Sequence, residues 1–129
     1  MSRKHILVAD DEQNTLMTMQ FILEVADYRV TTAENGQEAL DDILESRNTD
    51  SPIDLLITDI QMPGLTGLEL VDELNRLKMD IPFLVITGYG NSELEKELTD
   101  RGCDGCLDKP IDEEELVNSV ARLLGRTDK

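Results

Sequence analysis

The sequence has few cationic residues and no long hydrophobic segment. It contains 12 Lys and Arg against 28 Asp and Glu in 129 residues, a formal charge of −16. A chain this acidic lacks the cations that displace counterions from nucleic acid or bind an anionic membrane surface. No apolar run approaches the roughly 20 residues needed to span a bilayer, and no signal-peptide core precedes Ile6. We therefore expect a cytoplasmic protein that binds neither nucleic acid nor membranes.

Cysteine and histidine are also scarce. The sequence has two cysteines, Cys103 and Cys106, and one histidine, His5. A structural zinc site takes four ligands, and a thioredoxin-like motif opens a helix rather than entering a late strand. We interpret the cysteines as partly buried thiols in a reducing compartment. The length suffices for a core without disulfides or structural metal, so residues 1–129 are predicted to form one domain.

Apolar runs of strand length alternate along the chain with segments of helical periodicity. Strands are predicted at residues 5–9, 28–33, 55–58, 83–86 and 105–108. Helices are predicted at residues 14–26, 36–44, 67–77, 92–101 and 113–124. The third and fourth strands are apolar on consecutive residues, which is typical of strands covered on both faces. The pattern predicts an α/β fold: a doubly wound, five-stranded parallel sheet with five helices.

The predicted fourth helix, from Ser92 as a possible N-cap to Arg101, has the thinnest apolar stripe. Only Leu94 and Leu98 form that stripe, and most of their neighbours are charged. We expect this helix to be loosely docked. Two interpretations remain open: a solvated surface helix, or an element that shifts at low free-energy cost, as a switch requires.

Polar residues stand where four of the predicted strands end. The carboxyl ends of parallel strands share one edge, so these side chains should converge there. Clustered carboxylates repel one another unless a cation lies between them, and oxygen-only ligands favour Mg²⁺, with Mn²⁺ as an alternative. Adjacent aspartates can also simply cap a helix, but that interpretation leaves the third carboxylate and the lysine unexplained. The residues are Asp10, Asp11, Asp59, Thr87 and Lys109.

The predicted cluster contains the groups that phosphoryl transfer needs. A carboxylate can act as the nucleophile, while a cation, an ammonium and a hydroxyl stabilise charge on the phosphoryl oxygens. Each motif alone has an ordinary explanation: a lysine before proline is common on surfaces, and Thr87-Gly88 is a common turn. Their combination favours a phosphoryl-accepting site.

Five segments of the sequence resemble the receiver domain of bacterial two-component response regulators. They are Ile6–Glu12, Glu34–Leu40, Asp54–Gly64, Ile86–Gly88 and Asp108–Pro110. The resemblance covers nearly the whole chain. It implies a flavodoxin-like sheet with strand order 2-1-3-4-5 and a phosphorylation-activated signalling switch rather than a metabolic enzyme.

The resemblance also implies roles for single residues. Asp59 is expected to accept a phosphoryl group from a phosphohistidine of a sensor histidine kinase or histidine phosphotransfer protein. Mg²⁺ is expected to be held by the Asp11 and Asp59 side chains and the Gln61 backbone carbonyl, with Asp10 acting partly through water. Thr87 and Lys109 are expected to bind the phosphoryl oxygens.

The output implied by the resemblance is a change at the surface of the fourth helix, fifth strand and fifth helix. That surface would control a downstream effector domain or protein, and a phosphorylation-dependent dimer is an expected form. Gln61 and Tyr89 occupy positions that modulate dephosphorylation, and the bond before Pro110 is expected to be cis. Cys106 stands where the family usually has its switch aromatic, so we expect a weaker coupling or one through Tyr89.

Other functions fit parts of the pattern. A haloacid-dehalogenase-type aspartyl-phosphate phosphatase needs a second acid two positions after its nucleophile, where this chain has Gln61. A flavodoxin-like carrier conflicts with an acidic pocket, which repels a flavin phosphate. A phosphorylation-independent receiver that acts as a binding module remains open. The chain fits either a stand-alone receiver or a piece of a longer regulator.

Overall fold

The computed structural model describes residues 3–88 and 92–127, and within them five strands alternate with five helices. The strands are β1 (His5–Ala9), β2 (Arg29–Ala33), β3 (Leu55–Asp59), β4 (Phe83–Thr87) and β5 (Gly105–Asp108). The helices are α1 (Gln13–Val25), α2 (Gly36–Ser46), α3 (Gly67–Arg76), α4 (Ser92–Asp100) and α5 (Glu113–Thr127).

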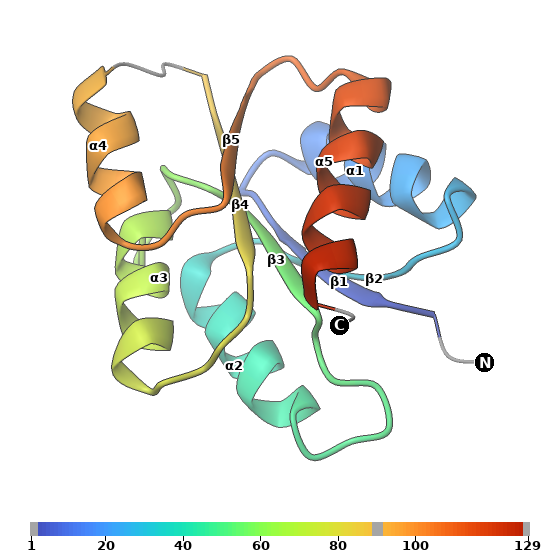
Figure 1. The fold of residues 1–129 in the computed structure, drawn as a ribbon, viewed down its shortest axis with the longest axis horizontal. Helices are drawn as coiled ribbons and strands as arrows, with labels where there is room; N and C mark the ends of the chain where they lie inside the picture. The colour runs from blue at the N-terminus through green and yellow to red at the C-terminus, as the bar shows by residue number, and fades with distance from the viewer. Residues whose placement is uncertain (1–2, 89–91, 128–129) are drawn as a thin grey trace.

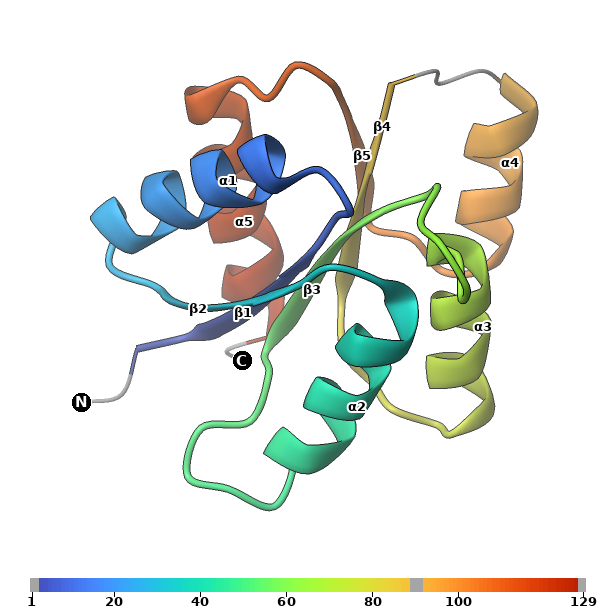
Figure 2. The same ribbon diagram turned by 180° about the vertical axis from the view of Figure 1, so that it is seen from behind.

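The strands form one parallel sheet in the order β2-β1-β3-β4-β5, which confirms the predicted topology. Helices α1 and α5 cover one face, and α2, α3 and α4 cover the other (Figures 1 and 2). The three inner strands are buried along their whole length because both faces are covered. Along β1, Ile6 and Val8 enter the core beneath α1 and α5, whereas Leu7 and Ala9 enter the opposite core.

Three helices end in the same hydrogen-bond pattern, at the edge where the strands begin. After α1, the Asp27 N–H donates to the Glu24 carbonyl and the Tyr28 N–H to the Leu23 carbonyl. The same pair of bonds follows α3 and α4, with Lys78 and Gly102 in the place of Asp27. All three have positive φ, and Asp27 (73°) and Lys78 (58°) adopt it without being glycine.

These helix ends explain small errors in the predicted boundaries. The prediction started the second strand at Tyr28, but the Tyr28 N–H closes α1, so β2 starts at Arg29. Ala26, Leu77 and Arg101 were predicted as last helical residues; they are instead the first residues after α1, α3 and α4, and their amides still donate to helix carbonyls. The ends of helices fray over one or two residues in this way.

Helix α4 contacts the rest of the molecule mainly near its C-terminal end. Leu98 is buried in the core on the α2–α4 face, and Leu94 is partly buried against it. Arg101 forms an ion pair with Asp72 of α3 at 2.8 Å, and its carbonyl accepts a hydrogen bond from the Asn75 side chain. The predicted thin stripe is confirmed. The predicted N-cap role of Ser92 stays a prediction, because the Ser92 side chain is not among those that the structure describes.

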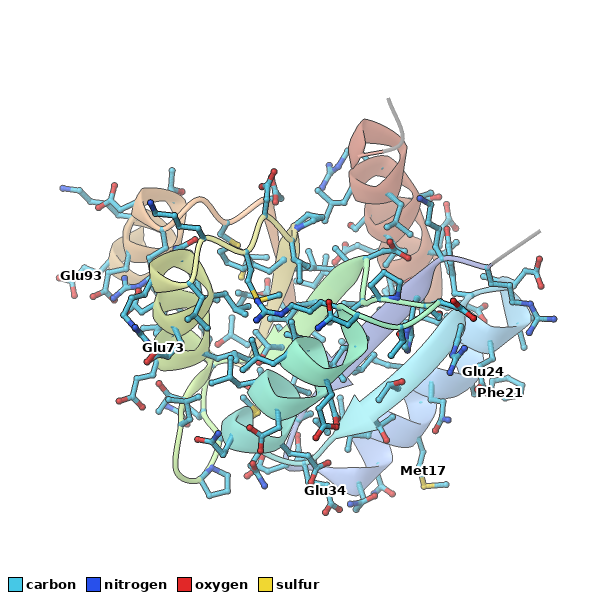
Figure 3. The ribbon with its side chains drawn as sticks, turned by 90° about the horizontal axis from the view of Figure 1, so that it is seen from below. Met17, Phe21, Glu24, Glu34, Glu73 and Glu93 are labelled. Carbon is cyan, nitrogen blue, oxygen red and sulfur yellow. The ribbon has the colours of Figure 1, made fainter. Side chains whose placement is uncertain are left out.

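Helix α1 exposes an apolar stripe on its outer surface. Met17, Phe21 and Val25 lie one turn apart and are 64%, 67% and 70% exposed; Figure 3 shows Met17 and Phe21 on the outer side of this helix. The helix has one charged residue, Glu24. The stripe is therefore an uncharged surface on a strongly acidic chain. No helix in the described ranges is long and apolar enough to cross a bilayer.

Candidate functional site

The carboxyl ends of the inner strands bring three aspartates together. One carboxylate oxygen from each of Asp10, Asp11 and Asp59 lies within 4.8 Å of the others. Asp10 and Asp11 follow β1, and Asp59 is the last residue of β3. They lie beside a cleft of about 670 Å³. Asp11 and Asp59 line it together with their sequence neighbours and residues of three other segments. Those residues are Glu12, Ile60, Gln61, Thr87, Gly88, Glu93, Leu94, Glu97 and Lys109.

Asp10 is completely buried, and one of its oxygens accepts no hydrogen bond. Its Oδ1 accepts from the Glu12 N–H at 2.9 Å. Its Oδ2 lies 3.1 Å from Lys109 Nζ without the geometry of a hydrogen bond, and it is the one buried side-chain oxygen or nitrogen in the described residues without such a bond. Burial, with the nearby charge of Asp59, raises the pKa of Asp10 to about 6.

Lys109 is the cation of the site and contacts three carboxylates. Its Nζ donates to Glu12 Oε1 at 2.6 Å and to Asp59 Oδ2 at 2.9 Å, in addition to the 3.1 Å approach to Asp10. Burial lowers the pKa of the ammonium, but the contacts with these acids outweigh burial, so the pKa lies above its ordinary value. Lys109 therefore stays charged.

Asp59 is held at the end of β3 by close backbone packing. Its Oδ1 accepts a hydrogen bond of 3.3 Å from the Gln61 N–H. The first residue of α3, Gly67, lies so close that an added Cβ would stand 2.2 Å from the Asp59 carbonyl oxygen. Only glycine permits this approach without displacing the backbone. The Gln61 N–H thus holds one oxygen of the Asp59 carboxylate, and the side chain lines the cleft.

Thr87 and Gly88 stand on the side of the cleft formed by β4. Thr87 is buried, and Gly88 has open space where a Cβ would be. Glu93, Leu94 and Glu97 of α4 line the wall beyond them. Any group added to Asp59 would therefore be close to both β4 and the first turns of α4.

The residues present fit a divalent cation. Three carboxylates converge, and the buried Asp10 Oδ2 accepts no hydrogen bond, although buried polar atoms normally do. The donor set contains only oxygen, which suits a hard cation such as Mg²⁺. Lys109 alone does not balance the acids around it. The cluster could hold such an ion through Asp10, Asp11 and Asp59.

A family description, "response regulator receiver domain", matches residues 6–121 of the chain. The chain belongs to this family. Its receiver domain is 34% identical over 125 residues to the response regulator SaeR of Staphylococcus aureus (strain USA300), a match that covers 97% of this chain and 52% of SaeR. The chain spans about half the length of the curated relatives it matches.

Solved structures support the same assignment. The receiver domain is 29% identical to a response regulator receiver domain protein from Clostridium thermocellum, with a TM-score of 0.87 over 97% of each chain. A CheY-like receiver domain protein from Methanospirillum hungatei JF-1 is 27% identical, with a TM-score of 0.87 over 98% of each chain. The resemblance and the fold inferred from the sequence are therefore confirmed.

Some residues singled out in the sequence lie outside the cleft. Cys106 is exposed on β5, opposite Val85 of β4, and not partly buried as predicted. Cys103 is partly buried, and burial raises the pKa of its thiol to about 11. Neither cysteine is in a disulfide, and both border a separate hollow beside Leu98. The Lys109–Pro110 bond of the receiver domain is cis, as expected. Tyr89 lies outside the described residues.

Glu12 is a member of the site for which the sequence predicts no role. It belongs to the first segment that resembles the family, Ile6–Glu12. In the structure it makes the shortest contact of the lysine. A third acid directly after Asp10 and Asp11 is a weak signal, because only the fold shows that it faces a residue 97 positions away.

Proposed function

We propose that Asp59 is the phosphoacceptor of a phosphorylation-activated switch. In this reaction an Asp59 oxygen attacks the phosphorus of a phosphohistidine, the P–N bond breaks and the imidazole leaves. The observation that carries the proposal is the position of Asp59: its carboxylate lies between a potential cation site and the Lys109 ammonium, and it borders an open cleft. A carboxylate so placed can react while charge is neutralised on both sides.

Mg²⁺, or Mn²⁺ in its place, is the cofactor we propose for this site. Asp11 and Asp59 would hold it through their side chains and Gln61 through its backbone carbonyl, with Asp10 acting partly through water. When bound, the ion neutralises charge on the phosphoryl oxygens and orients them. The support in this chain is the buried Asp10 Oδ2, which accepts no hydrogen bond and lies beside two more carboxylates.

Lys109 and Thr87 would bind the phosphoryl oxygens. Lys109 already donates to Asp59, so an oxygen added there would meet an ammonium within reach. The Thr87 hydroxyl is carried by the neighbouring strand and lines the same cleft. We propose that Gln61 and Tyr89 modulate the loss of the phosphoryl group through access of water.

The partners we propose follow from this chemistry. A histidine kinase or histidine phosphotransfer protein would supply the phosphoryl group. A downstream effector domain or protein would bind the surface formed by α4, β5 and α5. A phosphorylation-dependent dimer would be one active form. Because α4 lines the cleft through Glu93, Leu94 and Glu97, a change at Asp59 would be adjacent to that surface. Residues 1–129 would form one receiver unit.

Cys106 would make the coupling weaker than an aromatic side chain would. It is exposed on β5 and lies outside the residues that line the cleft. A small thiol makes few contacts, so it can do little to favour the phosphorylated conformation over the resting one. If Cys106→Tyr left partner affinity unchanged in both phosphorylation states, this position would carry no coupling.

Beryllofluoride with Mg²⁺ tests the proposed function directly. This mimic attaches to an aspartate carboxylate, so amide chemical shifts around Asp59, Thr87 and Lys109 should change in the unmodified chain and not in Asp59→Asn. Magnesium alone is the control for effects of the ion. No change in the unmodified chain would contradict the proposal and favour a binding module that acts without phosphorylation.

A further inference from the structure

Three acids crowd around the Lys109 ammonium in this structure. Two of its three N–H groups donate, to Glu12 at 2.6 Å and to Asp59 at 2.9 Å, and the Asp10 carboxylate lies 3.1 Å away. A phosphoryl oxygen that arrives on Asp59 must come close to the same ammonium, so it competes with these carboxylates for it. We therefore expect one of the present contacts to be released.

Burial decides which contact is released at the lowest cost. The Asp10 side chain is 0% exposed and cannot turn toward water, whereas the Glu12 side chain is 60% exposed. A carboxylate that returns to water regains its hydration, while a buried carboxylate that loses a cation partner cannot. Asp59 is itself the site of attachment. Glu12 is thus the partner that can leave.

We propose that Glu12 is a positioning residue that occupies Lys109 in the resting state and competes with the incoming phosphoryl group for it. This inference rests on the proposed phosphorylation of Asp59. Glu12 holds the ammonium in place before reaction, and it must release the ammonium for the phosphoryl oxygens to bind.

The surroundings of Glu12 support this role. Glu12 and Lys109 line the cleft at Asp59 and also a second hollow, which is bordered by Asn14, Thr15, Thr18, Pro110 and Ile111. Their ion pair is therefore part of the wall between the two hollows. The hydrogen bond to Lys109 and the charge of its ammonium lower the pKa of Glu12. The Glu12 side chain also accepts a long hydrogen bond of 3.4 Å from the Thr15 hydroxyl.

The test uses Glu12→Gln, which keeps the size of the side chain and removes its charge. With saturating Mg²⁺ and low ionic strength, the variant should bind beryllofluoride about two- to fivefold more tightly, a change in the range of an exposed ion pair. Chemical-shift titration gives the dissociation constant. The gain should shrink at high salt, because the pair is exposed.

Glu97→Gln is the matched control. Glu97 lines the same cleft from α4, and its loss changes the net charge equally without removing a contact of Lys109. In the same buffer, its dissociation constant should change less than that of Glu12→Gln, because Glu97 makes none of the three carboxylate contacts of Lys109. Melting temperatures of both variants show that the fold is intact.

Three outcomes would overturn the inference: Glu12→Gln binds beryllofluoride no more tightly, it binds more weakly, or Glu97→Gln shows an equal gain. The last result would assign the effect to general charge in the cleft. If the unmodified chain itself fails to bind beryllofluoride, the proposed function fails instead. The two failures are therefore distinguishable.

Discussion

The two ends of β1 carry buried polar side chains with opposite hydrogen-bond environments. His5 begins the strand and Asp10 follows it, about 16 Å away at 3.3 Å per residue. Both ring nitrogens of His5 have partners, the Ser51 carbonyl at 2.8 Å and the Thr31 hydroxyl at 2.7 Å. Asp10 instead keeps one buried oxygen without a hydrogen bond.

This difference extends along both edges of the sheet. At the edge where strands begin, His5 is satisfied and three helices close with paired backbone bonds. At the edge where strands end, carboxylates crowd around one lysine, and the Asp10 Oδ2 atom accepts no hydrogen bond. Buried polar groups with hydrogen bonds stabilise a fold, whereas buried polar groups without them are typical of sites that bind a ligand.

Asp10→Asn should give the largest change in Mg²⁺ affinity, and it tests the difference between the two edges of the sheet. The amide keeps the shape of the side chain but removes its charge, so Mg²⁺ affinity should fall by about 10- to 100-fold, the range for groups that support a metal from nearby. Without Mg²⁺, the free energy of unfolding should rise by about 1 kcal/mol, because a buried carboxylate no longer repels Asp59. Calorimetric titration and urea unfolding measure the two quantities. Lower stability with unchanged Mg²⁺ affinity would reverse the comparison.

His5→Ala, at the other end of β1, should lower stability and leave Mg²⁺ affinity unchanged. Removing the ring leaves the Ser51 carbonyl and Thr31 hydroxyl without their partner, which should lower the free energy of unfolding by about 1–2 kcal/mol. Mg²⁺ affinity should remain unchanged, because the cation site is at the opposite edge. Thr31→Val, which removes one of the two bonds, is the control and should cost less. A loss of Mg²⁺ affinity in His5→Ala would show that the edges are not independent.

Lys78→Gly should give a small gain in stability at the edge where strands begin. Lys78 has a φ of 58°, a conformation that glycine adopts without steric cost, so the free energy of unfolding should rise by about 0.5 kcal/mol. Lys78→Ala removes the same charge but keeps a Cβ, and it should give no gain. Equal stabilities of the two variants in urea unfolding would argue that the backbone at Lys78 is unstrained.

The topology and the convergence of the aspartates were predictable, because each depends on a regular pattern. Apolar runs such as Leu55–Thr58 predict covered strands, and parallel strands bring Asp10 and Asp59 to one edge. These rules need no knowledge of side-chain conformation. The family followed from the same segments.

The remaining features depend on contacts between residues distant in sequence. The left-handed helix ends at Asp27 and Lys78 have no glycine to indicate them. The two bonds of His5 join it to β2 and to the loop before β3, and the contact of Glu12 with Lys109 spans nearly the whole chain. No local pattern encodes such pairs, since they exist only after the strands are in register.

The ion pair between Arg101 and Asp72 attaches α4 to α3 at one end only. Arg101 is tied to α3 just beyond the C-terminal end of α4, while Glu93 and Leu94 at the other end border the cleft. A helix that pivots at Arg101 moves least there and most beside Asp59. For nine residues, or about 13 Å of helix, a tilt of about 10° displaces the far end by about 2 Å. The end of α4 that lines the cleft is therefore the end that such a tilt would displace most.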